Sequence, residues 1–274
     1  MKLNGIDYHV EQYGEGEPLL LLHGFTGSAD TWRPLLSHWS SWRCITVDLL
    51  GHGRTEAPAA AMRYRIERAA ADLAALLDQL GLKQVNVLGY SMGGRLALAF
   101  TIFYPHRVRR LILESSSPGL KTEAERRARR EADEALARRI EQEGVRAFVD
   151  YWEQIPLFAT QRRLPAPVRA ALRRERLRHT AVGLANSLRG MGTGVQPSFW
   201  EQLGGVQQPV LLLCGEEDEK FCRLATQMRE RLPNSERMSV SQAGHAIHVE
   251  QPEIFAKIVS EFMTRGNCEC RFHG

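Results

Sequence analysis

Long apolar segments are missing from this chain of 274 residues, and so is a strong excess of charge of one sign. The longest purely aliphatic run, Leu19–Leu22, is far shorter than the ~20 residues of a membrane span, so no membrane-spanning helix is expected. The first residues contain no apolar core and already carry three acidic residues by Glu15, unlike a signal peptide. The predicted location is therefore the cytoplasm.

Cysteine is also scarce, with five in the whole chain. A chain of this length can bury enough surface to fold without disulfide or metal staples. We interpret Cys44, Cys214 and Cys222, which lie in or beside apolar runs, as small buried hydrophobic residues. Cys268 and Cys270 form a CxC near a histidine in the last seven residues. Two thiolates and one histidine make a poor zinc site, so we expect a tail there and no metal.

The net charge of +4 comes from one internal segment. Residues 121–189 contain 16 basic and 10 acidic residues, whereas the rest of the chain contains 20 basic and 22 acidic residues. The basic residues of this segment are interleaved with acidic ones and form no recognised nucleic-acid motif. We therefore expect no nucleic-acid partner, and most of these arginines are expected to coat solvated helix faces.

Short aliphatic runs alternate with helical patterns over the first 118 residues and return near the C-terminus. Near-continuous apolar runs of this kind are typical of parallel strands that helices cover on both faces. The runs are Leu19–Leu22, Cys44–Val47, Val85–Leu88, Leu111–Leu113 and Val210–Leu213. Apolar residues at helical spacing predict helices from Ile66 to Leu80 and around Ile254–Phe262. The predicted class is α/β, with a mostly parallel sheet flanked by helices.

Residues 119–200 interrupt this alternation, because they are rich in alanine and arginine and contain no convincing strand. We predict a core formed by 1–118 and 201–267, with a helical lid of 119–200 inserted into it. A tail, 268–274, follows the core. Four prolines in the lid are expected to divide it into separate short helices.

The strongest chemical motif is the G-x-S-x-G sequence around Ser91, which follows an apolar strand and precedes a helix-forming stretch. On such a sharp turn the serine hydroxyl projects above the sheet edge, and Gly89 and Gly93 keep side chains out of the crowded turn. The helix N-terminus behind Ser91 favours developing negative charge. Ser91 is the predicted nucleophile or base.

A catalytic serine hydroxyl needs a base, and the base needs an acid that orients it. Asp218 follows the apolar run Val210–Leu213, and His245 precedes the last predicted helix. Ser91, Asp218 and His245 thus occur in the chain order of α/β hydrolases. The sequence also offers rivals, which are Glu216, Glu217 and Glu114 for the acid and His248 for the base.

Two backbone amides are predicted to stabilise an oxyanion. His23-Gly24-Phe25 follows the Leu19–Leu22 run, and Met92 follows the serine. The N–H groups of Phe25 and Met92 are therefore expected to point at the same reacting oxygen.

Taken together, five segments resemble the α/β-hydrolase superfamily over residues 3 to 265: HGFTGS, DLLGHGRT, GYSMGG, CGEEDEKF and AGH…QPE. Three further pieces resemble a narrower family, the 2-succinyl-6-hydroxy-2,4-cyclohexadiene-1-carboxylate synthases of menaquinone biosynthesis: GYSMGGR, the PLF at 156–158 and LRGMGTGVQP.

The resemblance implies an α/β-hydrolase fold with a helical lid and a triad of Ser91, Asp218 and His245. It also implies substrate-binding residues, which are Tyr90, Arg95, Arg129, Trp152, Phe158 and Arg176. The register of Arg129 and Arg176 is open because arginines flank both. Independently of the resemblance, a substrate with several carboxylates needs several fixed cations, and guanidinium groups suit bidentate binding.

The implied function is a lyase that eliminates pyruvate from 2-succinyl-5-enolpyruvyl-6-hydroxy-3-cyclohexene-1-carboxylate, a small polycarboxylate, without a cofactor. One alternative is a serine hydrolase of a small ester or C–C bond. The other is a ligand-binding protein of the same fold with little turnover. The sequence leaves the oligomeric state open.

Overall fold

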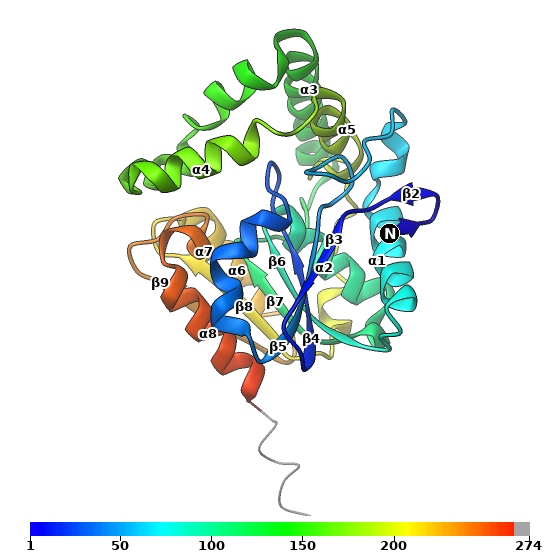
Figure 1. The fold of residues 1–274 in the computed structure, drawn as a ribbon, viewed down its shortest axis with the longest axis vertical. Helices are drawn as coiled ribbons and strands as arrows, with labels where there is room; N and C mark the ends of the chain where they lie inside the picture. The colour runs from blue at the N-terminus through cyan, green and yellow to red at the C-terminus, as the bar shows by residue number, and fades with distance from the viewer. Residues whose placement is uncertain (266–274) are drawn as a thin grey trace, which may run out of the picture.

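The computed structural model of the chain describes residues 1–265 and is built around a seven-stranded sheet (Figure 1). The strand order is β3-β5-β4-β6-β7-β8-β9. β3 runs antiparallel to β5, and every other neighbouring pair is parallel. The strands are β3 (Val10–Tyr13), β4 (Glu17–Leu22), β5 (Trp42–Val47), β6 (Val85–Tyr90), β7 (Val108–Glu114), β8 (Val210–Gly215) and β9 (Ser235–Val240), and a separate hairpin pairs β1 (Lys2–Leu3) with β2 (Ile6–Asp7).

The four leucines of β4 explain why the central strands are apolar throughout. Side chains alternate between the two faces of a strand. Leu20 and Leu22 pack into one core cluster, whereas Leu19 and Leu21 pack into the cluster on the other face. All four are completely buried. Layers on both faces of the sheet therefore require the uninterrupted aliphatic runs that the sequence contains.

Helices cover both faces of the sheet. α1, α2 and α6 contribute to the cluster on one face, and η1 and α8 contribute to the other. The helices of the core are α1 (Ile66–Gln79), α2 (Met92–Phe103), α6 (Glu219–Arg229), α7 (Ile247–Glu250) and α8 (Pro252–Thr264), with the 3₁₀ segments η1 (Ala29–Trp39), η2 (Ala61–Tyr64), η3 (Pro105–Arg107) and η5 (Leu203–Gly205). The predicted α/β class with a mostly parallel, helix-flanked sheet is confirmed.

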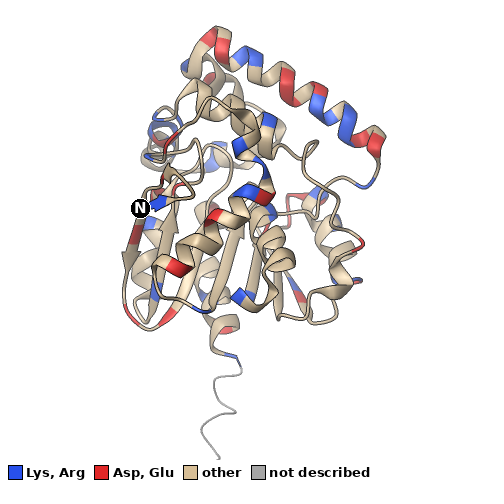
Figure 2. Cartoon of the chain, turned by 90° about the vertical axis from the view of Figure 1, so that its right-hand side faces the viewer, with Lys and Arg blue, Asp and Glu red and all other residues tan. Residues whose placement is uncertain are grey.

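A helical layer lies between β7 and β8 in the chain and above the sheet in space (Figure 1). It consists of α3 (Glu123–Trp152), η4 (Pro156–Arg163), α4 (Ala166–Arg176) and α5 (Ala181–Met191). α3 and α5 share a small apolar core of their own. Acidic and basic residues alternate along these helices (Figure 2), as expected for solvated helix faces.

The local details of this layer differ in part from the prediction. Pro156 and Pro165 do stand at the starts of η4 and α4. The first helix, however, is not short, and its one interruption is at Gly144, whose φ of 82° lies in the left-handed region. No proline marks that kink, so proline spacing alone could not locate it.

Four strands were not predicted, because they are either polar or very short. β9 reads SERMSV and β3 reads VEQY, and both lie at an edge of the sheet, where one side has no neighbouring strand. β1 and β2 have only two residues each. Cys268 and Cys270, with the predicted tail, lie outside the described residues.

Candidate active site

Ser91 stands on a strained turn between β6 and α2. Its φ of 50° and ψ of −106° are unfavourable for a residue with a side chain. The turn is also crowded, since a Cβ on Gly93 would lie 2.2 Å from the Leu22 carbonyl oxygen and a Cβ on Gly89 would lie 2.4 Å from the Gly93 carbonyl oxygen. The two glycines thus allow the backbone to present the serine hydroxyl at the carboxyl edge of the sheet.

Ser91, His245 and Asp218 form a continuous hydrogen-bonded chain. The Ser91 Oγ lies 3.0 Å from Nε2 of His245, and Nδ1 of His245 lies 2.6 Å from Oδ2 of Asp218. The three residues follow β6, β9 and β8, whose carboxyl ends meet at one edge of the sheet. His245 and Asp218 are both buried. This geometry allows the imidazole to take the serine proton while the carboxylate orients the ring.

The backbone around Asp218 fixes the direction of its carboxylate. Asp218 is the N-cap of α6, and its Oδ1 accepts a hydrogen bond of 3.3 Å from the Phe221 amide. Its Oδ2 is then left for His245. One carboxylate therefore serves both the helix start and the imidazole.

Three of the four rival residues are paired elsewhere, and the fourth is exposed. Glu114 and His248 bind each other, with Nδ1 of His248 at 2.9 Å from each carboxylate oxygen of Glu114. Both are buried beneath Tyr90, whose ring centroid lies 4.5 Å from that of His248. Glu216 is exposed, and Glu217 accepts a hydrogen bond of 2.6 Å from Arg163.

His23 supports the loop that carries Phe25 and is not a base. Its Nε2 accepts a hydrogen bond of 2.9 Å from the Leu49 amide, and its Nδ1 lies 2.7 Å from the Gly24 carbonyl oxygen, to which it must donate. Complete burial lowers the pKa of His23 to about 4, so the ring is neutral at pH 7. Phe25 and Met92, the two predicted oxyanion residues, line the same cavity as Ser91.

A cavity of about 410 Å³ opens in front of Ser91 and His245. Tyr90, Trp152 and Phe158 form part of its aromatic wall. Among the described residues that line it, four are basic and one is acidic, namely Arg95, Arg129, Lys220, Arg223 and Glu125. A cavity with this balance suits an anionic ligand.

Arg95 is a buried cation that faces this cavity. It is only 9% exposed and donates to the Met191 carbonyl oxygen at 2.8 Å and to Oε1 of Gln196 at 2.6 Å. Within residues 1–265, no carboxylate lies at ion-pair distance from it. Burial, together with nearby Arg129, lowers the pKa of Arg95 to about 10, so it stays charged at neutral pH. A desolvated guanidinium with neutral partners is a natural anion-binding group.

Arg129 is more exposed and is already paired. Its side chain is 43% exposed, and its Nε donates to Oδ1 of Asp133 at 2.8 Å. Burial raises the pKa of Asp133. The two guanidinium groups of Arg95 and Arg129 thus share a single nearby aspartate.

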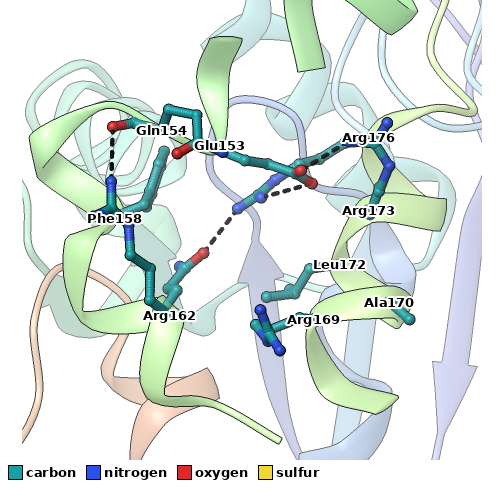
Figure 3. A pocket seen from close by; sticks show the side chains of 10 residues that line it. Glu153, Gln154, Phe158, Arg162, Arg169, Ala170, Leu172, Arg173 and Arg176 are labelled. Atoms are coloured by element: carbon teal, nitrogen blue, oxygen red, sulfur yellow. Dashed lines mark hydrogen bonds and ion pairs between the residues drawn. The ribbon is translucent and has the colours of Figure 1, made fainter. Parts of the chain in front are cut away.

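Arg176 lies on the far side of Phe158, outside the lining of the catalytic cavity. It lines a neighbouring cavity of about 440 Å³ between η4 and α4 (Figure 3). There it donates to Gln161 at 3.0 Å and lies 3.4 Å from Glu153, with its guanidinium 5.1 Å from the Phe158 ring centroid. Of the predicted substrate-binding residues, the structure brings all but Arg176 to the cavity in front of Ser91.

Sequence reasoning missed several residues that line or support the cavity. Lys220 and Arg223 come from the first turns of α6, directly after Asp218. Gln196 holds Arg95 from 101 positions away in the chain. Lys220 could have been found from its place in CGEEDEKF, but no local pattern links Gln196 to Arg95.

The described residues give no indication of a metal site or a membrane span. Residues 1–265 contain no group of three or more histidine, cysteine, aspartate or glutamate side chains that could hold a metal ion. No helix in the same range is long and apolar enough to cross a bilayer.

Comparisons with known proteins agree with this geometry. The profile of the alpha/beta hydrolase fold family matches residues 17–252. A Bacillus subtilis (strain 168) protein, named provisionally as a 2-succinyl-6-hydroxy-2,4-cyclohexadiene-1-carboxylate synthase, is 50% identical over 263 residues, which cover 95% of this chain and 96% of that protein. The synthase of that name from Serratia proteamaculans (strain 568) is 32% identical, over 93% of this chain and 96% of its own length. The structure of MenH from S. aureus matches with a TM-score of 0.90 and 35% identity, covering 94% of this chain and 97% of that one.

Proposed function

The chain belongs to the α/β-hydrolase fold family and, within it, to the 2-succinyl-6-hydroxy-2,4-cyclohexadiene-1-carboxylate synthases, and from this premise we propose the reaction that it catalyses. It is a carbon–oxygen lyase that eliminates pyruvate from 2-succinyl-5-enolpyruvyl-6-hydroxy-3-cyclohexene-1-carboxylate, a step of menaquinone biosynthesis.

The names of substrate and product define the change in bonds. Ring carbon 2 of the substrate carries the succinyl carbonyl, so its proton is acidic. Removal of that proton allows the ring double bond to shift, which gives the 2,4-diene and breaks the bond between carbon 5 and the enolpyruvyl oxygen. The leaving group takes up a proton and becomes pyruvate. No electron leaves the molecule, and so the elimination balances without a redox cofactor.

In the proposed mechanism Ser91 is a base and does not acylate. Its Oγ takes the proton from ring carbon 2 while His245 takes the hydroxyl proton, a transfer that the 3.0 Å contact between Oγ and Nε2 supports. Asp218 stabilises the resulting imidazolium through the 2.6 Å contact at Nδ1. The enolate charge that develops on the succinyl carbonyl oxygen rests on the amides of Phe25 and Met92. His245 then returns its proton to the departing pyruvate.

The substrate has three carboxylates, and we propose that Arg95 and Arg129 bind two of them. The aromatic residues Tyr90, Trp152 and Phe158 then enclose the ring. Arg176 is the candidate for the third carboxylate, which it would reach past the Phe158 ring from the neighbouring cavity.

One observation favours the lyase over a general serine hydrolase. The cavity in front of Ser91 has four basic residues and one acidic residue in its lining, and Arg95 is buried there without a carboxylate partner among residues 1–265. A neutral ester would gain nothing from these cations, and the burial of Arg95 without an anionic ligand is costly. A substrate with several carboxylates gives each cation a partner.

The test is an assay of two reactions with one enzyme preparation. Pyruvate release from the cyclohexene substrate is measured with a coupled lactate dehydrogenase assay, and p-nitrophenyl acetate hydrolysis is measured by absorbance. We expect a kcat/KM for the cyclohexene substrate at least ~10³-fold above that for the ester, since only the first engages the buried cations. A better rate with the ester would favour the hydrolase, and no turnover of either would favour the ligand-binding protein.

We also propose a cytoplasmic location, and a division of the chain into a core of 1–118 and 201–267 with a lid of 119–200.

A further inference from the structure

Two thiols lie against each other beside the active site, in a position that the catalytic proposal does not use. Cys214 is in β8, and Cys222 is in the first turn of α6. Their sulfur atoms are 2.7 Å apart, and both cysteines are free. Bonded disulfide sulfurs lie about 2.05 Å apart, so a further approach of about 0.7 Å would join them. Sequence analysis interpreted both as buried hydrophobic residues, but Cys222 is only half-buried.

A cation lies beside this pair. Nη2 of Arg237 is 3.7 Å from the Cys214 sulfur, and Nε of Arg237 is buried without a hydrogen-bond partner among the described residues. A guanidinium next to thiols favours the thiolate, which is the reactive form. Burial, followed by the contact with Cys222, raises the pKa of Cys214 to about 12. The half-buried Cys222 is therefore the sulfur that an oxidant from solvent meets first.

We propose that Cys214 and Cys222 form an oxidative modification site, where a peroxide converts the two thiols into an intramolecular disulfide. The Cys222 thiolate attacks one peroxide oxygen, the O–O bond breaks, and the leaving hydroxide becomes water. The resulting Cys222 sulfenic acid is then attacked by the Cys214 sulfur. The S–O bond breaks, and a second water leaves with the Cys214 proton. Two thiols are oxidised and one peroxide is reduced to two waters.

The new bond would enclose the loop that carries Asp218. This residue lies midway between the two cysteines, and the loop is held by hydrogen bonds from the Asp218 amide to Gly215 at 3.0 Å and from the Cys222 amide to Asp218 at 2.9 Å. Pulling the first turn of α6 toward β8 moves the Asp218 carboxylate relative to His245. Moving a catalytic group by even about 1 Å lowers the rate of the chemical step. Because Asp218 contacts His245, oxidation should lower kcat, and KM should rise as well, since Lys220 on the same helical turn lines the substrate cavity.

The test uses the full chain with Cys268→Ser and Cys270→Ser, which removes competing thiols. The protein is treated with a few equivalents of hydrogen peroxide, then analysed by intact mass and by mapping of non-reduced peptides. We expect a loss of about 2 Da, a linked peptide pair joining Cys214 to Cys222, and a fall in kcat of about fivefold that dithiothreitol reverses. Cys222→Ser should show no link and no fall in kcat, whereas the matched control Cys44→Ser should behave like the parent.

One outcome would overturn the modification site, and another would overturn its effect on catalysis. Addition of oxygen to Cys222 without a linked peptide would show that the pair does not close, and a linked enzyme with unchanged kcat would show that the bond does not act on Asp218. The effect on kcat rests on the triad of the proposed function, but the mass and peptide map do not. An enzyme without the proposed lyase activity would therefore still show whether the modification site exists.

Discussion

Replacing Arg95 by alanine removes the cation that is most firmly built into the cavity. The guanidinium is 9% exposed and held by Met191 and Gln196, so it is already oriented before a ligand binds. In Arg95→Ala a substrate carboxylate would enter the same desolvated site without its partner. The loss should appear in both KM and kcat, because the charge also holds the ring in place during proton removal.

The size of the effect follows from the burial of the pair. Loss of one partner of a buried, hydrogen-bonded charge pair costs roughly 2–5 kcal/mol. At about 1.36 kcal/mol per tenfold change, kcat/KM should fall by roughly 30-fold to several thousandfold. Arg95→Lys keeps the charge but loses the planar guanidinium, whose Nη1 donates to both Met191 and Gln196, so its loss should be smaller than that of the alanine variant.

The assay is pyruvate release over a range of substrate concentrations, with thermal unfolding of each variant as a check on folding. Arg138→Ala is the matched control, because the Arg138 side chain is 68% exposed and pairs with Glu134 on the surface of α3. Its kcat/KM should stay within about twofold of the parent enzyme. Similar losses in Arg95→Ala and Arg138→Ala would mean that the basic residues act as a diffuse field, and the reasoning about Arg95 would be refuted.

Three further predictions concern the triad, His23 and the buried pair of Glu114 and His248. Ser91→Ala and His245→Ala should each abolish nearly all turnover, and the double variant should be little worse than either, because the groups act as a unit; more than about a tenth of the parent activity in Ser91→Ala would contradict its assignment. The folded pKa of His23 is about 4 against an ordinary 6.5, so the unfolded chain binds a proton between these values that the folded chain does not, and stability falls as the pH falls from 6.5 toward 4. In urea unfolding, this ring should make the free energy of unfolding about 2 kcal/mol lower at pH 5 than at pH 7. The free energy of unfolding of His23→Gln should change less over this pH range. His248→Ala should lower the free energy of unfolding by roughly 3–5 kcal/mol, because the completely buried Glu114 carboxylate loses the imidazole that contacts both its oxygens; a loss below about 1 kcal/mol would contradict this.

The central strands could be predicted because burial on both faces forces aliphatic runs. Leu19–Leu22 is an example, since its side chains fill both core clusters. The edge strands could not be predicted, because a strand such as Ser235–Val240 is only partly covered and its sequence can be polar. The kink at Gly144 was missed for another reason, namely that one glycine within a helical pattern does not reveal its backbone angles.

The candidate triad could be predicted because each member follows a strand whose carboxyl end meets the others at one edge. The choice between rivals could be reasoned from loop position, but the structure adds a physical cause: Glu114 and His248 bind each other. Contacts between side chains far apart in the chain could not be predicted. The bond between Arg95 and Gln196 and the position of Arg176 behind Phe158 depend on how helices pack, and sequence spacing does not contain that information.

The central claim is that Ser91 acts as a base and never becomes acylated. Rapid-quench intact-protein mass spectrometry of the enzyme with the cyclohexene substrate tests it directly, with pyruvate measured in the same samples. We expect pyruvate to accumulate while the protein mass stays that of the free enzyme at every time point. A covalent adduct that maps to Ser91 and forms and decays at the rate of turnover would contradict the elimination mechanism.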